Sequence, residues 1–409
     1  MLVRKLWSSP SLRSSFLFGV GGIVFAIANI VLARALPDEE YGLAVLVYAL
    51  CQIGIVLGPC GINIIVVRRG LSPDPHLLAR VIPSSAVVAV GVALAGALLY
   101  PLGPVLLFAI AAGCLGGGVN SVAAAHYQSW HRFTTSLAVF QNQNGVLLLG
   151  AIACVVFDVR SAWLPCVVLA LGLVLSGAIS WTHLLRGTSA ATKAQTFSWK
   201  EGLFLVGVPI VDLLLVQMER VLIPRVLTLS DLATYAILAS LVGSPFRMLQ
   251  LGVRYTILPR LTAARTVRER RDLLRRESVI AILMVAGGSV AVWIMTPLMA
   301  RWFLAGKYDL TSALILAAIV SGVLRVVSAL CTSVTVALGG ARQLGQLNAA
   351  SVGSLVIAVV AATVGAHWGI AGVIYGVAAG WLSRIVVAMV LAAPHLRQRD
   401  GEPPGRGPA

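Results

Sequence analysis

Residues 86–99 read AVVAVGVALAGALL, a run without a charged or hydrogen-bonding side chain. Apolar and polar residues do not alternate in it, as they would in a strand of an outer-membrane barrel. A helix needs roughly 20 apolar residues to cross a hydrocarbon core of about 30 Å. The run extends to that length between residues 81 and 100, and it therefore predicts a membrane-spanning helix.

Similar apolar stretches recur along the chain, with short loops between them. We expect about twelve spans, near residues 14–33, 42–66, 81–100, 104–125, 137–157, 162–184, 202–224, 233–253, 278–300, 311–337, 345–366 and 369–393. Hydrophobic residues make up 58% of the chain and charged residues only 11%, against roughly a quarter charged in soluble domains. The sequence predicts an all-α polytopic membrane protein with no room for a soluble catalytic domain.

Lysine and arginine residues are distributed unevenly over the two sides that these spans define. One side holds Arg4, Lys5, Arg13, Arg68, Arg69, Arg80, Arg132, Arg186, Lys193, Lys200, the arginines of 254–276, Arg342 and the tail arginines; the other holds only Arg34, Arg160, Arg225, Arg301 and Lys307. Because positive loops stay in the cytoplasm, we expect a multi-pass protein of the bacterial cytoplasmic (inner) membrane with both termini inside. The net charge of +16 is then a topology signal, and its spread over alternate loops argues against nucleic acid as a partner.

The densest basic run is TVRERRDLLRRES at residues 266–278. It lies between the eighth and ninth predicted spans, on the cytoplasmic side. We expect it to form an amphipathic helix that rests on anionic lipid.

A weak internal repeat divides the chain into halves. Residues 34–36 (RAL) match 225–227 (RVL), and residues 41–44 (YGLA) match 235–238 (YAIL). With six spans in each half, the two six-helix bundles are related by a pseudo-two-fold axis along the membrane normal. We expect an N-terminal bundle at 1–185, a cytoplasmic linker at 186–201, a C-terminal bundle at 202–396 and a disordered cytoplasmic tail at 397–409.

Cysteine and histidine residues lack the spacing of a metal or catalytic site. The six cysteines form no CxxC pair and fall in or beside apolar spans, so we expect small buried residues and no disulfides. His126 and His131, at the cytoplasmic end of the fourth span, are expected to be solvated. Since no Gly-rich phosphate loop, nucleophile elbow or HExxH motif is present, we predict no enzyme, no cofactor and no metal.

Two hairpins carry a family resemblance. They are VLARALPDEEYGLAVLVYAL at 31–50, followed by GPCGINIIVVRRG at 58–70, and MERVLIPRVLTLSDLATYAILASLVGSPFRML at 218–249. Together with the number of spans, they resemble the polysaccharide-biosynthesis membrane proteins, the O-antigen and exopolysaccharide flippases of the multidrug, oligosaccharidyl-lipid and polysaccharide exporter superfamily. The resemblance implies a V-shaped pair of bundles that moves undecaprenyl-pyrophosphate-linked glycans across the membrane by alternating access, for lipopolysaccharide or exopolysaccharide assembly.

Charged residues inside the spans are the main functional candidates, because a charge at the bilayer centre costs about 2.5–3.5 kcal/mol and usually meets a partner or a watery cavity. Arg325 lies between two apolar runs, near the midplane, either as a ligand of an anionic group or as half of a structural ion pair. Arg220 and Arg247 are further substrate-binding candidates, because a guanidinium binds phosphate oxygens bidentately. For Arg247 the alternative is snorkelling to the headgroups, which is the interpretation we favour for Arg384.

Two carboxylates share the seventh span with Arg220. Asp212 and Glu219 lie two helical turns apart and so share a face, while Arg220 points about 100° away. This arrangement permits a proton or sodium site. The alternative is that Glu219 pairs with an arginine of another helix, such as Arg325, and only holds the bundle together.

Neutral amides mark the first half of the chain. Asn29 and Asn120 are candidates for recognising sugar hydroxyls, and the alternative is that they form hydrogen bonds between helices. The same alternatives apply to Gln52 and to residues 141–144 (QNQN).

Three functions remain open at this point. A flippase would have a lipid-linked glycan and membrane lipids as partners, H⁺ or Na⁺ as candidate coupling ions, and a monomeric state. An ion-coupled multidrug or small-molecule exporter of the same superfamily is the alternative, which Asp212 and Glu219 favour and the cationic candidates disfavour. A lipid-linked polymerase or ligase would need a sizeable outer loop, whereas the outer loops here have only about 2–10 residues.

Overall fold

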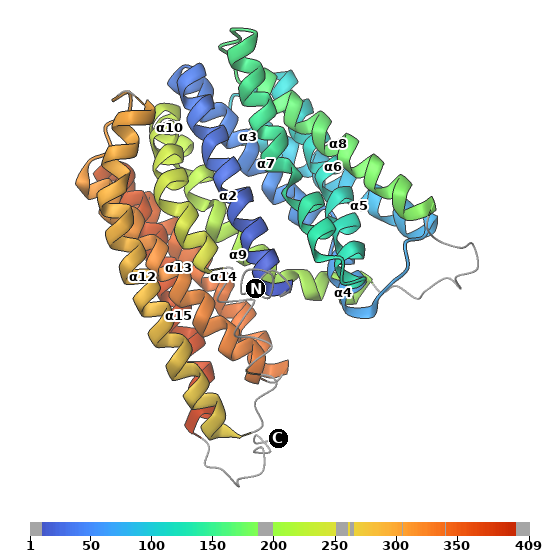
Figure 1. The fold of residues 1–409 in the computed structure, drawn as a ribbon, viewed down its shortest axis with the longest axis vertical. Coiled ribbons are helices and arrows are strands. Elements are labelled where there is room, and N and C mark those ends of the chain that lie inside the picture. Colours follow the sequence, from blue (N-terminus) through green and yellow to red (C-terminus); the bar gives the residue numbers. More distant parts are fainter. Residues whose placement is uncertain are drawn as a thin grey trace, which may run out of the picture. The chain divides into compact units, whose positions relative to one another are not determined.

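The structure is a computed structural model that describes residues 10–186, 199–250, 261, 266–304, 306–339 and 341–397. These residues form helices joined by short turns, and the described ranges contain no strand (Figure 1). Within them, nine helices are long and apolar enough to cross a membrane. The predicted all-α membrane fold is confirmed.

The helices follow the predicted spans closely. Before residue 187 they are α2 (Pro10–Ala35), α3 (Asp38–Leu57), α4 (Ile62–Arg69), α5 (Pro75–Leu99), α6 (Pro104–Ser129), α7 (Phe133–Val156) and α8 (Trp163–Arg186). After it come α9 (Trp199–Val226), α10 (Leu229–Leu238), the π-helical turn η1 (Ala239–Gly243), α12 (Val267–Leu304), α13 (Ser312–Leu338), α14 (Ala341–Gly365), the 3₁₀ turn η2 (Ala366–Trp368) and α15 (Gly369–Arg397). Every predicted span overlaps one or two of these segments.

The predicted span at 42–66 is wrong in one respect, because a turn divides it into α3 and α4. Pro59, within this turn, has no N–H with which to continue the helical hydrogen bonds. Gly61 then adopts a φ of +83°, a left-handed conformation that favours glycine. A Cβ at Gly61 would lie 2.1 Å from the carbonyl oxygen of Gly202, so glycine also permits a close approach to α9.

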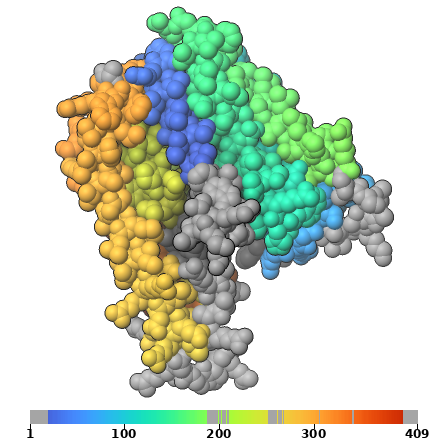
Figure 2. All heavy atoms as spheres, in the orientation of Figure 1, coloured from blue at the N-terminus to red at the C-terminus, as the bar shows by residue number. Residues whose placement is uncertain are grey.

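The basic run at 266–278 corrects a second expectation. It forms no separate amphipathic helix but the first turns of α12, which has 38 residues. At 1.5 Å per residue this helix is about 57 Å long, well beyond a hydrocarbon core of about 30 Å. Many apolar side chains of α12 are exposed, among them Ile282 and Leu283, and Figure 2 shows the helix, gold to orange, open on the surface. This exposure is typical of a helix that faces lipid.

Contacts divide the chain into two compact units. The first comprises Met1–Ser240 and Ala300–Asp309, and the second comprises Leu241–Met299 and Leu310–Ala409. The chain passes from the first to the second unit within η1, between Ser240 and Leu241, where a π turn makes the helix irregular. The predicted linker at 186–201 does not coincide with this division and lies largely outside the described residues, as does the tail from 398. The predicted bundle boundaries therefore stay a prediction.

In the first unit, α6 packs against α3, α5, α7 and α8. Glycine residues let these helices approach closely, as is common in membrane bundles. A Cβ at Gly117 would lie 2.2 Å from Cγ1 of Ile55 in α3, and a Cβ at Gly116 would lie 2.6 Å from the backbone nitrogen of Val174 in α8. The core of the first unit is therefore built around a helix with a small-residue surface.

In the second unit, α15 packs against both α13 and α14. A Cβ at Gly376 would lie 2.3 Å from the Cα of Ala362, so the backbones of α15 and α14 are nearly in contact. A hydrogen bond from Thr335 Oγ1 to the carbonyl oxygen of Ala388, at 3.0 Å, joins α13 to α15. These contacts hold α15 between its two neighbours.

His126 corrects the expectation of a solvated histidine. Its side chain is fully buried, and its ring centre lies 5.5 Å from that of Trp181, edge to face. The apolar residues of α4 and of the following turn, including Val66 and Leu71, form a buried cluster with Trp181 at this end of α6. The sequence did not show that α4 folds back over the end of α6.

Candidate functional site

Arg220 is a buried cation in the first unit. Its side chain, on α9, is only 7% exposed. The guanidinium carbon lies 5.8 Å from the ring centre of Phe25 on α2 and 6.0 Å from that of Tyr48 on α3. Nη1 donates a hydrogen bond to Oε1 of Gln217 at 2.9 Å. Aromatic faces attract a guanidinium, so three helices hold this charge in place.

A small cavity adjoins Arg220. Its walls come from α2, α3, α7 and α9, and they are Phe25, Asn29, Leu32, Ala44, Val45, Tyr48, Leu147 and Arg220. The Nε of Arg220 is buried and makes no hydrogen bond with any residue that the structure describes. The first unit therefore contains a buried cation whose Nε–H does not donate a hydrogen bond to any described residue.

The two asparagine candidates form hydrogen bonds inside the protein. Asn29 donates to the carbonyl oxygen of Phe25 at 2.8 Å and accepts a hydrogen bond from the Tyr41 hydroxyl at 2.9 Å. Asn120 donates to the carbonyl oxygen of Val139 at 2.8 Å and accepts one from Ser176 Oγ at 3.0 Å. These bonds join α2 to α3 and α6 to α7 and α8, which favours the role between helices.

Other amides of the first unit are used in the same way. Nε2 of Gln52 donates to Oε1 of Gln143 at 2.7 Å, which joins α3 to α7. Nδ2 of Asn144 donates to the carbonyl oxygen of Gly21 at 3.0 Å, which joins α7 to α2. A sugar would have to compete with these internal acceptors and donors.

Both carboxylate candidates lie on α9. Glu219 is fully buried, whereas Asp212 is half-buried. Gln217 lies between them in the sequence and is also buried, and it accepts the hydrogen bond from Arg220. The C-terminal half of α9 thus concentrates polar groups in the interior of the first unit.

In the second unit, Arg325 and Arg384 lie beside the same indole. The guanidinium carbon of Arg325, on α13, is 5.9 Å from the ring centre of Trp381, and that of Arg384, on α15, is 6.0 Å from it. Trp381 is fully buried, and its Nε1 makes no hydrogen bond with the described residues. The sequence 310–397 contains no Asp or Glu, so the helices α13, α14 and α15 carry only positive side-chain charges.

Arg384 and Arg247 differ from the expectations for them. The side chain of Arg384 is 1% exposed, so the interpretation that it snorkels to the headgroups is wrong. Its guanidinium lies beside the buried Trp381 and not at the surface. Arg247 is exposed. Arg325 is half-buried, which leaves part of its side chain accessible.

The acidic residues of the first hairpin were not among the predicted site residues. Glu40 Oε2 accepts hydrogen bonds from the backbone N–H of Ala162 at 2.6 Å and from Ser161 Oγ at 3.1 Å, just before α8 begins. Tyr41 holds Asn29, as described above. The motif PDEEY at 37–41 is thus a structural junction, and its position between two apolar runs was the only signal in the sequence.

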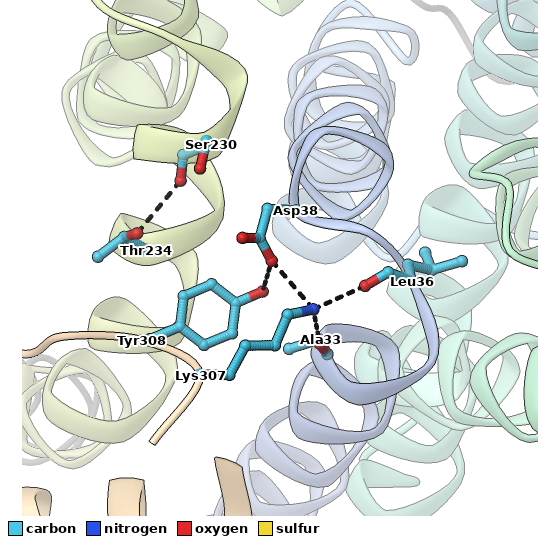
Figure 3. A network of polar contacts seen from close by, with 7 residues as sticks. All are labelled: Ala33, Leu36, Asp38, Ser230, Thr234, Lys307 and Tyr308. Carbon is cyan, nitrogen blue, oxygen red and sulfur yellow. Dashed lines mark hydrogen bonds and ion pairs between the residues drawn. The ribbon is translucent and has the colours of Figure 1, made fainter. Parts of the chain in front are cut away.

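Asp38, in the same motif, binds the segment that follows α12 (Figure 3). Its carboxylate lies 3.0 Å from Nζ of Lys307 and accepts a hydrogen bond from the Tyr308 hydroxyl at 2.9 Å. Burial and the Asp38 carboxylate raise the pKa of Tyr308, so its hydroxyl stays a donor at neutral pH. All three residues belong to the first unit.

Comparisons with known proteins give matches to solved structures alone. No protein-family model matches the chain, and no curated protein matches it by sequence. The chain is similar to a structure described as lipid II flippase MurJ in an inward closed conformation, with a TM-score of 0.69 and 10% identity over 94% of this chain and 90% of that one.

Two multidrug transporters are similar as well. One is an inward-facing multidrug resistance MATE family transporter of the MOP superfamily, with a TM-score of 0.62 and 14% identity over 91% of this chain and 93% of that one. The other is the MATE multidrug transporter DinF-BH, with a TM-score of 0.62 and 13% identity over 97% of both chains. At these identities the likeness shows only that the chain shares the fold of these solved structures.

Proposed function

We propose that this chain moves a lipid-linked oligosaccharide of the undecaprenyl-pyrophosphate type across the bacterial cytoplasmic membrane, for the assembly of a surface polysaccharide. Transport is by alternating access, in a fold that is found in flippases and exporters. The observation that supports the proposal most is that, in each unit, arginine side chains lie against aromatic rings between the helices. They are Arg220 in the first unit and Arg325 with Arg384 in the second.

A pyrophosphate suits these arginines chemically. A guanidinium donates two parallel hydrogen bonds to phosphate oxygens, and a membrane interior with little competing water strengthens them. Arg325 is half-buried and so can be reached by a ligand, while the fully buried Arg384 adds a second positive charge beside Trp381. The absence of carboxylates in the sequence 310–397 gives this part of the second unit a positive field.

Asp212 and Glu219 have a separate place in the proposal. A buried carboxylate in a membrane helix is costly unless it is neutralised by a proton, a cation or another partner. Since Glu219 is fully buried, we assign to this pair of carboxylates the coupling of transport to H⁺ or Na⁺.

An ion-coupled multidrug exporter is the second candidate. The buried Glu219 favours it, because cationic drugs bind to carboxylates, and two of the similar structures are multidrug transporters. The arginine clusters oppose it, since like charges repel a cationic substrate. The two candidates therefore differ in the sign of charge that the transported molecule should carry.

Deletion of the gene in its host tests the proposal. We expect loss of the surface glycan and accumulation of lipid-linked repeat units in the cytoplasmic leaflet. Wild-type protein and the Arg186→Gln control should restore export, because Arg186 is exposed at the end of α8, whereas Arg325→Ala should not. Normal surface glycan together with greater sensitivity to toxic cations would overturn the flippase in favour of the exporter.

A further inference from the structure

Three basic residues from distant parts of the sequence meet at one pocket of the first unit. Arg34 is in the last turn of α2, Arg160 is in the loop between α7 and α8, and Lys307 follows α12. The pocket has a volume of about 740 Å³. These residues are three of the five basic residues that the sequence assigns to the outer side, so positive charge gathers here where the chain otherwise has little.

The carboxylates at this pocket do not cancel its charge. Asp158 lies 3.4 Å from Nε of Arg160, but both side chains are largely exposed, at 83% and 73%. Such an exposed surface ion pair is weak, so an anion of higher charge can displace it. Asp38 pairs with Lys307, and Arg34 adds a third positive charge. The three basic side chains at the pocket therefore outnumber its two carboxylates, and the pocket has a net positive charge.

The walls of the pocket are apolar on the side of α7. Val155 lines it and is 57% exposed, and Phe157, two residues on, is 71% exposed. Exposed apolar side chains at the end of a membrane-spanning helix face acyl chains. The pocket therefore offers cations beside a lipid-facing surface, which is the pattern that an anionic lipid needs.

We propose that this pocket binds the phosphate group of an anionic lipid, with Arg34 and Arg160 as its main ligands. Their guanidinium groups can each donate two hydrogen bonds to phosphate oxygens. The phosphate belongs either to a phospholipid of the membrane or to a lipid-linked glycan. The site is distinct from the buried arginines of the proposed function and does not depend on it.

The contacts of Lys307 link the site to the structure of the first unit. An ammonium group has three N–H donors, and Lys307 uses them on Asp38 at 3.0 Å and on the carbonyl oxygens of Ala33 and Leu36, both at 2.8 Å (Figure 3). A phosphate that reaches Lys307 must therefore compete with one of these acceptors. Among these acceptors only Asp38 carries a charge that the phosphate can replace. Lipid binding therefore weakens the ion pair between Lys307 and Asp38 at the α2–α3 turn.

Binding to the purified full-length protein tests the site. The probes are short-chain dihexanoyl phosphatidylglycerol, the zwitterionic dihexanoyl phosphatidylcholine, undecaprenyl pyrophosphate and inorganic pyrophosphate, and the readout is the shift of the thermal unfolding midpoint with concentration. We expect saturable stabilisation by phosphatidylglycerol or undecaprenyl pyrophosphate, and none by phosphatidylcholine. Whichever of the two anionic lipids binds more tightly identifies the source of the phosphate.

Matched arginine variants make the test specific. The double variant Arg34→Gln/Arg160→Gln should weaken binding at least about tenfold, while the exposed-arginine control Arg186→Gln/Arg342→Gln should leave it unchanged. Arg34→Lys/Arg160→Lys, which keeps the charge, should lie between them. All four sites are exposed, and an unchanged midpoint without ligand will show that folding is intact. Equal loss in the control, or equal binding of inorganic pyrophosphate, would overturn the proposal.

The competition at Lys307 has its own readout. Asp38→Asn removes the rival charge, so binding of the anionic lipid should become tighter, by about threefold for a screened charge near the surface. The Glu39→Gln variant removes a neighbouring exposed charge and serves as the control. Tightening by both variants alike would reduce the effect to net charge and overturn the competition.

Discussion

Nζ of Lys307 lies 3.0 Å from the carboxylate of Asp38 and donates hydrogen bonds to two carbonyl oxygens at the end of α2. The C-terminal end of a helix dipole favours a positive charge at this place. The segment 300–309 thereby belongs to the first unit, although the chain on both sides of it belongs to the second. Lys307, together with the hydrogen bond from Tyr308 to Asp38, connects this segment to the α2–α3 turn (Figure 3).

Replacing Lys307 by methionine should destabilise the first unit. The change removes two hydrogen bonds and one ion pair, but the side chains of Lys307 and Asp38 are about one-third exposed, at 34% and 36%. Solvent screening therefore limits the expected loss to about 1 kcal/mol. Thermal unfolding in detergent measures it, and Arg301→Gln, an exposed change in the same segment, is the control. Equal midpoints for the two variants would contradict this role of Lys307.

Loss of the Glu40 side chain should destabilise the protein more than loss of its neighbour Glu39. Glu40 accepts hydrogen bonds from Ala162 N–H and Ser161 Oγ, where an anion also interacts with the N-terminal end of the α8 dipole. Glu39 is exposed. We expect Glu40→Ala to cost about 1.5 kcal/mol and Glu39→Ala under about 0.5 kcal/mol. Expression level and unfolding midpoint of the two variants, compared side by side, decide the point.

A pair of glycine variants tests the packing of the second unit. A Cβ at Gly376 would lie 2.3 Å from the backbone of Ala362, whereas a Cβ at Gly353 on α14 would meet nothing within 4 Å. Gly376→Ala should therefore force α14 and α15 apart and reduce the amount of folded protein. Gly353→Ala should be neutral or stabilising by up to about 1 kcal/mol, because alanine favours a helix. Size-exclusion profiles in detergent measure the amount of folded protein for each variant. More folded protein for Gly376→Ala than for Gly353→Ala would contradict the close contact between α14 and α15.

The helices could be predicted from sequence because long apolar runs determine membrane spans almost by themselves. Where the prediction failed, a local feature competed with hydropathy. Gly58-Pro59 and the left-handed Gly61 broke a run that looked continuous, and the basic run at 266–278 continued a helix because nothing in it, neither glycine nor proline, ends one.

The site was harder to predict, since a single sequence does not say which helix covers which side chain. Arg384 lies near the end of a span and was expected to reach the headgroups, yet its neighbours bury it. The pairing of Asp38 with Lys307 joins two turns without periodicity, so no pattern connects them. The position of Arg220 inside a span could be predicted from the apolar run around it, but its aromatic partners on α2 and α3 could not.

Arg325 and Arg384 should respond differently to truncation. Arg325 is half-buried, so Arg325→Ala should abolish transport at near-normal membrane abundance, and Arg325→Lys should restore part of it, because lysine keeps the charge but not the planar fork. Arg384 is fully enclosed, so Arg384→Ala leaves a cavity beside Trp381 and should lower abundance. Quantitative immunoblots of membranes, together with the export assay, separate the two effects. Loss of abundance in Arg325→Ala would instead assign Arg325 a structural role.

Transport by the purified protein tests the central claim most directly. Proteoliposomes carrying a fluorescent undecaprenyl-pyrophosphate oligosaccharide in both leaflets are exposed to a reductant that cannot cross the membrane. Without transport, only the fluorophores of the outer leaflet are bleached. We predict nearly complete bleaching with the wild-type protein and with Arg186→Gln, and outer-leaflet bleaching alone with Arg325→Ala. Outer-leaflet bleaching alone with the wild-type protein, in vesicles where the same preparation transports a lipophilic cation, would contradict the account.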